Sequence, residues 1–251
     1  MAKIKPQSKP GFWYLVVKAI LRPPLQLLTK RDWRGGENLQ HDGGAILAMN
    51  HLSWFDPFAA GHFCDSQGRP ARFLAKAEIF KIPVIGNMLK SAGQIPVHRG
   101  SVNAASSLHS AIAAVNNGEC IIIYPEGTLT RDPNLWPMSA KNGVARIALA
   151  TGVPVIPAAQ WGPQEVLATY GGKVPKFFPR KTMRMLAGPP VDLSDLLGQP
   201  VTPEALRTAT ERIMAEITRL LAELRNEPIP ASVYDRRVAL NQQTDESKDE
   251  A

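Results

Sequence analysis

A histidine and an aspartate five residues apart are the strongest chemical signal in this sequence. His51 follows the apolar run Ala45–Met49 through Asn50, and Asp56 precedes Pro57. A neutral imidazole accepts a proton from a hydroxyl group, and a carboxylate behind it fixes its tautomer and stabilises the imidazolium that forms. The pair therefore indicates a general base with its orienting acid. A structural interpretation stays open, because Asp before Pro is typical of a helix N-cap.

Two further predicted strands also end in polar residues. Arg99 follows the strand Gln94–His98, and the turn Glu126–Thr128 follows the continuous apolar strand Glu119–Tyr124. If these strands are parallel neighbours, their carboxyl ends meet at one edge of the sheet, where open α/β sheets place their sites. An arginine fork fits phosphate, and glycine lets the backbone approach a ligand closely. Together they favour a site for an anionic substrate whose hydroxyl is activated, although each alone is also common at ordinary strand exits.

The order of the elements that position these residues predicts an α/β fold with a mostly parallel, mixed sheet flanked by helices. Residues 78–91 are predicted to be broken, partly helical structure, and residues 160–181 a long loop. Strands are expected over residues 45–49, 71–75, 94–98, 119–124, 153–159 and 182–187, and helices over 57–63, 102–116, 140–150 and 202–226.

Composition narrows the class of protein. The 251 residues include 29 basic and 22 acidic side chains, so the formal net charge of +7 favours an anionic partner. Cys64 and Cys120 lack metal-like spacing, which predicts a reducing compartment with neither a disulfide framework nor a metal site. The most apolar segment, residues 12–28, is interrupted by Lys18, Arg22 and two prolines. It is therefore predicted neither to span a bilayer nor to be a signal peptide.

The positive charge is concentrated in a leader, residues 1–34, where Asp32 is the single acidic residue. Aromatic and aliphatic residues lie between the basic ones, as in helices that lie on anionic lipid. The alternative is a helix that packs on the domain with its lysines in water. We expect this membrane-associating segment to precede a domain over residues 35–230 and a polar, disordered tail over 231–251. The basic residues of the leader are Lys3, Lys5, Lys9, Lys18, Arg22, Lys30, Arg31 and Arg34.

With these motifs in order, the chain resembles the glycerophospholipid acyltransferases of the lysophosphatidic-acid acyltransferase type. The likeness covers about residues 33–191. The motif Asn-His-x4-Asp is met by Asn50–Asp56, a strand ending in arginine by Gly93–Gly100, Pro-Glu-Gly-Thr by Pro125–Thr128, a proline-flanked apolar strand by Val153–Ala158, and a lysine-bearing segment by Phe73–Glu78.

The resemblance implies a role for each matching residue. His51 would deprotonate the acceptor hydroxyl and Asp56 would orient it, so that the hydroxyl attacks an acyl thioester without an acyl-enzyme intermediate. Since residues five apart do not share a helical face, a tight turn must fold the acid back. The glycerol phosphate would be held by Lys76, Arg99, Glu126, Gly127 and Thr128.

One position departs from the family pattern. The family usually has arginine directly after Glu-Gly-Thr, whereas this chain has Leu129 there and Arg131 two residues later. Arg131 is expected either to reach back to the phosphate from a rearranged loop or to accompany a different acceptor. The departure concerns the acceptor more than the acyl-transfer chemistry.

The resemblance also implies the partners. The donor would be acyl-CoA or an acyl carrier protein thioester, the acceptor a lysophospholipid, and the location the cytoplasmic face of a membrane with anionic lipid. No cofactor, metal ion or nucleic acid is expected. Two alternatives stay open: an acyltransferase for another polar lipid or glycolipid acceptor, and a basic membrane-binding module without catalysis. The second explains the charge of the leader but not the polar strand ends.

Overall fold

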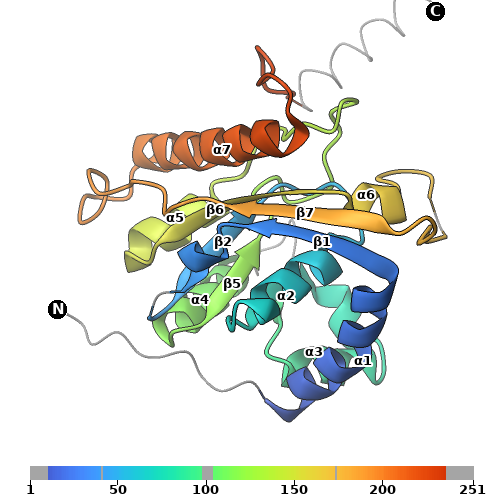
Figure 1. Cartoon of the computed structure of the whole chain (residues 1–251). Helices are drawn as coiled ribbons and strands as arrows, with labels where there is room; N and C mark the ends of the chain where they lie inside the picture. Colours follow the sequence, from blue (N-terminus) through green and yellow to red (C-terminus); the bar gives the residue numbers. More distant parts are fainter. Residues whose placement is uncertain (1–10, 41, 98–103, 173, 236–251) are drawn as a thin grey trace, which may run out of the picture.

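The structure of the protein is a computed structural model that describes residues 11–40, 42–97, 104–172 and 174–235. It is built around a seven-stranded mixed sheet (Figure 1). The strands are β1 (Thr29–Arg34), β2 (Ala45–Met49), β3 (Ala71–Lys76), β4 (Ile95–Val97), β5 (Cys120–Ile123), β6 (Val155–Trp161) and β7 (Lys181–Ala187). Their order is β1-β7-β6-β2-β5-β3-β4. All pairs are parallel except β6 with β7. The predicted fold class is confirmed.

Helices cover both faces of this sheet. They are α1 (Phe12–Leu28), α2 (Asp56–Ser66), α3 (Ile85–Ser91), α4 (Ala104–Asn116), α5 (Gly143–Thr151), α6 (Pro163–Val166) and α7 (Pro203–Arg225), with 3₁₀ turns η1 (Gly36–Leu39) and η2 (Ala77–Lys81). In Figure 1, α7 crosses one face, and α1, α2 and α3 lie on the other side of β1 and β7. Helices α4, α5 and α7 share one apolar cluster, and α2 belongs to a second.

The central strand β2 is fully apolar because both of its faces are buried. Ile46 and Ala48 face the cluster of α4, α5 and α7, whereas Leu47 and Met49 face the cluster of α2. Successive side chains of a strand point to opposite faces, so each layer receives every second residue. This two-sided burial holds the strand that leads directly into Asn50.

The sheet begins earlier than the sequence indicates, because the leader contributes a strand. β1 pairs in parallel with β7 at the edge of the sheet. Its sequence is polar, and Thr29 is its single buried residue. Edge strands with charged side chains lack the apolar alternation by which strands are recognised. The predicted loop 160–181 likewise contains the end of β6 and the short helix α6.

Helix α1 forms within the leader and packs beside α2. Asp65, near the end of α2, forms an ion pair with Lys18 Nζ at 2.7 Å. It also accepts a hydrogen bond from the Tyr14 hydroxyl at 3.4 Å. None of the residues of α1 is fully buried. Across the described ranges, no helix has both the length and the apolar character needed to cross a bilayer. Most of the predicted tail, residues 236–251, lies outside the described residues.

Candidate active site

Asn50 and Gln160 form a hydrogen-bonded pair between β2 and β6, directly before the histidine. The Gln160 N–H donates to Asn50 Oδ1 at 2.8 Å, and the Asn50 side-chain amide donates to the Gln160 carbonyl at 3.1 Å. The Gln160 side-chain amide in turn donates to the Asn50 carbonyl at 2.9 Å. Both residues are buried. Because β2 and β6 are parallel neighbours, this pair prolongs their contact and fixes the backbone at the point where His51 leaves the sheet.

His51 and Asp56 meet through a tight turn, as the sequence predicts. His51 Nδ1 lies 2.8 Å from Asp56 Oδ2. The same oxygen accepts the N–H groups of Leu52 and Ser53 at 2.6 and 2.9 Å. A carboxylate oxygen that already accepts two N–H groups favours the imidazole tautomer with its proton on Nδ1, which leaves Nε2 as the basic nitrogen. The other oxygen, Oδ1, is buried without a hydrogen-bond partner among the described residues.

The capping alternative for Asp56 is wrong. Helix α2 starts at Asp56, its N-cap is Phe55, and no side chain caps it. Pro57 does occupy the first turn, as expected. The carboxylate faces backward to the turn, not forward to the helix, because its three donors all come from residues 51–53.

Tyr124 packs against the imidazole ring of His51. Its ring stacks on His51 with the centroids 4.1 Å apart and the planes 12° from parallel. Burial, and secondarily the charge of Asp56, raises the pKa of the Tyr124 phenol, which therefore stays neutral. The His51 side chain keeps 11% of its surface exposed. The stack and the carboxylate together fix the orientation of the imidazole ring.

The pKa of Asp56 is raised, chiefly by its complete burial. Hydrogen bonds from His51, Ser53 and Leu52 lower it and offset part of that effect. A buried carboxylate in contact with an imidazole stabilises positive charge on the ring more strongly than one in water does. The arrangement suits a base that becomes an imidazolium during the reaction.

Glu126 holds the backbone of His51 in place from the neighbouring strand end. Its Oε1 accepts the His51 N–H at 3.0 Å, and its Oε2 accepts the Met138 N–H at 3.1 Å. The Thr130 N–H donates to the His51 carbonyl at 2.9 Å, so both backbone groups of the histidine are bound. Burial raises the pKa of Glu126 to about 8, against the lowering effect of the two N–H donors. The carboxylate thus serves the positioning of His51.

The predicted cationic residues have different surroundings in the structure. Lys76 ends β3, two strands away from β2, and lies 3.8 Å from Glu78. The Arg131 guanidinium stacks over the Tyr170 ring at 4.2 Å. Arg99 lies outside the described residues. Leu129, at the position of the family's arginine, is buried in the core.

Lys141 is a cation of this edge that the sequence analysis missed. A Cβ atom placed on Gly127 would lie 3.3 Å from Cδ and Cε of Lys141 and 3.4 Å from its Nζ. The Lys141 N–H also donates to the Pro125 carbonyl at 2.9 Å. Gly127 has φ +72°, which glycine adopts without strain. The turn therefore uses a glycine where it passes beneath the lysine side chain, next to Glu126.

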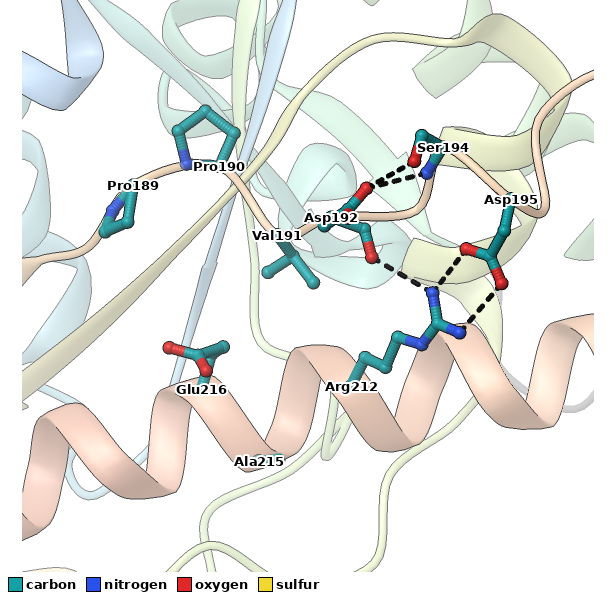
Figure 2. A pocket seen from close by; sticks show the side chains of 9 residues that line it. All are labelled: Pro189, Pro190, Val191, Asp192, Ser194, Asp195, Arg212, Ala215 and Glu216. Carbon is teal, nitrogen blue, oxygen red and sulfur yellow. Dashed lines mark hydrogen bonds and ion pairs between the residues drawn. The ribbon is translucent and has the colours of Figure 1, made fainter.

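A hollow lined by residues after β7 and by residues of α7 lies away from this site (Figure 2). It follows the carboxyl end of β7, which is antiparallel to β6, so it lies at the opposite edge of the sheet from His51. Arg212 spans it and binds both oxygens of Asp195, at 2.5 and 2.8 Å. None of the predicted site residues lines it. In the part of the chain that the structure describes, no group of three metal-ligating side chains occurs either.

Comparison with known proteins agrees with the geometry. The chain is 30% identical over 184 residues to the 1-acyl-sn-glycerol-3-phosphate acyltransferase of Bacillus subtilis, which covers 73% of this chain and 84% of that protein. It is 33% identical over 160 residues to the chloroplastic 1-acyl-sn-glycerol-3-phosphate acyltransferase BAT2 of Brassica napus, which covers 63% of this chain. The match spans 45% of the length of that plant relative.

A solved structure shares the fold. The crystal structure of the 1-acyl-sn-glycerophosphate acyltransferase PlsC from Thermotoga maritima superposes with a TM-score of 0.63, covering 88% of this chain and 81% of that one at 24% identity. The sequence model of the acyltransferase family matches residues 30–161. That range contains His51, Asp56 and the Glu126–Thr128 turn. The chain therefore belongs to the acyltransferase family.

Proposed function

We propose that the protein transfers a fatty acyl group from a thioester to the free hydroxyl of a 1-acyl-glycerol 3-phosphate or a close relative of it. The observation that carries the proposal is the His51 imidazole, which is fixed by Asp56 through Nδ1 at 2.8 Å. Within the described residues, no side chain forms a hydrogen bond with Nε2 of His51. The names of the Bacillus and Brassica relatives give the substrate class.

The reaction needs one base and no covalent enzyme intermediate. Nε2 of His51 accepts the proton of the acceptor hydroxyl while the oxygen forms a bond to the thioester carbonyl carbon. The tetrahedral oxyanion then collapses, the carbon–sulfur bond breaks, and the imidazolium returns the proton to the leaving thiolate. Asp56 stabilises the imidazolium between these two steps. The products are the diacylated acceptor and a free thiol, either coenzyme A or an acyl carrier protein.

Lys141 is the residue that we assign to the acceptor phosphate. Its ammonium lies against Gly127, beside the glutamate that holds the histidine. Within the described residues, no carboxylate lies within ion-pair distance of Lys141. The family's arginine position is taken by the buried Leu129, so the phosphate needs another cation at this turn. Lys76, at the end of β3, and Arg131, in the segment after β5, are further candidates, and Arg99 remains a predicted ligand.

The acceptor is a membrane lipid, and α1 is the segment proposed to bind the membrane. The helix exposes Phe12, Ile20 and Leu27, at 72%, 62% and 72% of their surfaces. Lys18 and Arg22 lie on the side that faces Asp65. An amphipathic helix of this kind lies in the plane of a lipid surface with its apolar side inward. Coenzyme A or an acyl carrier protein is proposed as the donor carrier on the basis of the thioester chemistry alone.

The function is tested with the purified full chain, a panel of acyl-CoA and acyl carrier protein donors, and several acceptors. We expect thiol release with 1-acyl-glycerol 3-phosphate, and a product whose mass has increased by one acyl group. Acceptors without phosphate serve as the comparison. Absence of thiol release across the whole panel would contradict the proposal.

A second acceptor class has one observation in its favour, the apolar Leu129 at the family's arginine position. If the acceptor were a glycolipid or another polar lipid alcohol, it would not need the full set of cations. Competition between a phosphate acceptor and a glycolipid acceptor in one assay decides between them. Preferential acylation of the glycolipid would replace the phosphate acceptor but leave the roles of His51 and Asp56 unchanged.

Replacement of Lys141 by alanine is expected to raise the KM for a phosphate acceptor by about tenfold or more. A hydrogen bond to a charged group contributes about 1.5–3 kcal/mol, and about 1.4 kcal/mol corresponds to tenfold. The value of kcat should change little, since the histidine is untouched. Steady-state kinetics with varied acceptor measure both constants. Lys30→Ala, on the exposed edge strand β1, is the matched control, and an unchanged KM for Lys141→Ala would remove Lys141 from the phosphate site.

A further inference from the structure

An exposed aliphatic loop joins η2 to α3. Val84 exposes 68% of its surface, and Ile82, Ile85 and Ile79 expose 45%, 46% and 39%. Four branched apolar residues within seven positions are thus in contact with solvent. Isolated exposed apolar residues are ordinary, but a group of them on one loop marks an interaction surface. The catalytic arrangement described above does not use this loop.

The backbone at the tip of the loop is strained. Val84 has φ +66° and ψ −58°, and the Ile85 N–H donates to the Pro83 carbonyl at 2.8 Å. These values define a γ-turn of the rare, strained hand, with a β-branched residue at its centre. Glycine adopts this conformation more easily than valine does. The presence of a valine side chain at such a position is a reason to look for a function of that side chain.

The loop already satisfies most of its own backbone donors. The N–H groups of Ile82 and Gly86 donate to the carbonyls of Ile79 and Ile82, at 3.2 and 2.8 Å. The Ile85 N–H is bound within the γ-turn, and Pro83 has no N–H. An unbound backbone N–H is costly in an apolar medium, so a loop that binds its own donors can leave water at low cost.

The surroundings of the loop favour lipid as the partner. Helix α3 packs beside α1, and a Cβ on Gly11 would lie 3.3 Å from the Ser91 carbonyl oxygen (Figure 1). The exposed apolar residues of α1 and of the loop therefore belong to neighbouring elements. Lys81 and Lys90 flank the loop and are exposed. Cations around an aliphatic tip complement an anionic lipid surface, where the charges meet headgroups and the tip meets acyl chains.

We propose that the loop Ile82–Ile85, with Val84 at its tip, inserts into the surface of an anionic membrane as a second contact beside α1. The proposal rests on the membrane location given under the proposed function and adds the part of the protein that enters the lipid. The loop follows β3, whose carboxyl end lies at the same edge of the sheet as His51. Insertion of the loop would therefore turn the edge that carries His51 toward the lipid.

The variant Val84→Gly separates this proposal from folding. Glycine relieves the γ-turn strain, so we expect a Tm equal to or above that of the unchanged protein. Loss of the valine side chain from lipid should weaken the binding to vesicles of phosphatidylglycerol and phosphatidylcholine by about tenfold. Co-sedimentation with sucrose-loaded vesicles measures the binding. The control is Val201→Gly, since Val201 is 41% exposed before α7 on the other face of the sheet and should have no effect.

Two outcomes would overturn the proposal. One is binding of Val84→Gly to the vesicles with unchanged affinity, and the other is an equal loss in Val201→Gly. Turnover of a water-soluble short-chain donor and acceptor should be the same in all three proteins, because the loop holds none of the residues around His51. If soluble substrates give no turnover in any of them, the proposed acyl transfer fails and the vesicle result stands independently.

Discussion

Replacement of His51 by alanine is expected to lower kcat by about a thousandfold, the loss typical of a removed general base. Asp56→Asn should lower it by about a hundredfold, for a different reason. All three side-chain hydrogen bonds of Asp56 are made by Oδ2, whereas Oδ1 has no partner among the described residues. An asparagine can place its oxygen at the Oδ2 position and its amide at the Oδ1 position. The tautomer and the turn are then kept, and only the negative charge behind the imidazolium is lost.

Stability measurements distinguish this loss from damage to the fold. Burial raises the pKa of Asp56, so its ionised form disfavours the folded state, and asparagine removes that cost. An asparagine amide at the unpartnered Oδ1 position is a buried donor without an acceptor, which offsets this gain, so we expect the Tm of Asp56→Asn to stay close to that of the unchanged protein. Asp192→Asn, at the exposed loop after β7, is the matched control and should leave kcat unaltered. Full activity of Asp56→Asn or His51→Ala would refute the roles given to the pair.

The sequence was sufficient for the parts of the site that are local in the chain. The run Ala45–Met49 is apolar because both faces of β2 are buried, and that pattern is readable without a structure. The His51–Asp56 contact closes within six residues, so its turn also follows from spacing. The strand β1 was missed because a polar edge strand resembles a charged connector. No local pattern distinguishes the two.

Contacts between segments that are distant in the chain could not be predicted from the sequence. Tyr124 and Gln160 lie 73 and 109 positions after His51, and their contacts depend on the strand order. The polar residue at the end of β6 was the available signal for Gln160, since it mirrors Asn50 at the end of the parallel strand β2. The proximity of Lys141 to Gly127 depends on the loop between β5 and α5, whose path has no sequence signature.

The position of His51 depends on three side chains. Its side chain is fixed from α2 through Asp56, its ring packs on Tyr124 at the end of β5, and its backbone N–H is bound by Glu126. A base works best when its geometry is set before the substrate arrives, because its alignment then costs nothing during the reaction. The buried side chain of Glu126, which accepts the backbone N–H groups of His51 and Met138, is the part of this arrangement that the family motif alone does not explain.

Glu126→Gln is expected to lower kcat by about tenfold to a hundredfold with little change in the KM of the acceptor. The two carboxylate oxygens accept two backbone N–H groups, from His51 and Met138. Glutamine offers one oxygen and one amide donor, so one of these N–H groups faces another donor. Such a loss costs about 1–3 kcal/mol of stability and loosens the histidine backbone. A rise in KM with unchanged kcat would instead make Glu126 a phosphate-site residue, and Glu204→Gln on the exposed first turn of α7 is the control.

The pH dependence of unfolding tests the same residue independently. The pKa of Glu126 is raised from 4.5 to about 8 in the folded state, so the folded protein holds a proton that the unfolded chain releases. Stability from this group is complete below about pH 4.5 and is lost as the pH rises through about 8. Glutamine cannot ionise, so the difference in Tm between the unchanged protein and Glu126→Gln should narrow over that window. A difference that widens toward pH 8 would mean that the carboxylate is ionised throughout and that the two N–H donors outweigh its burial.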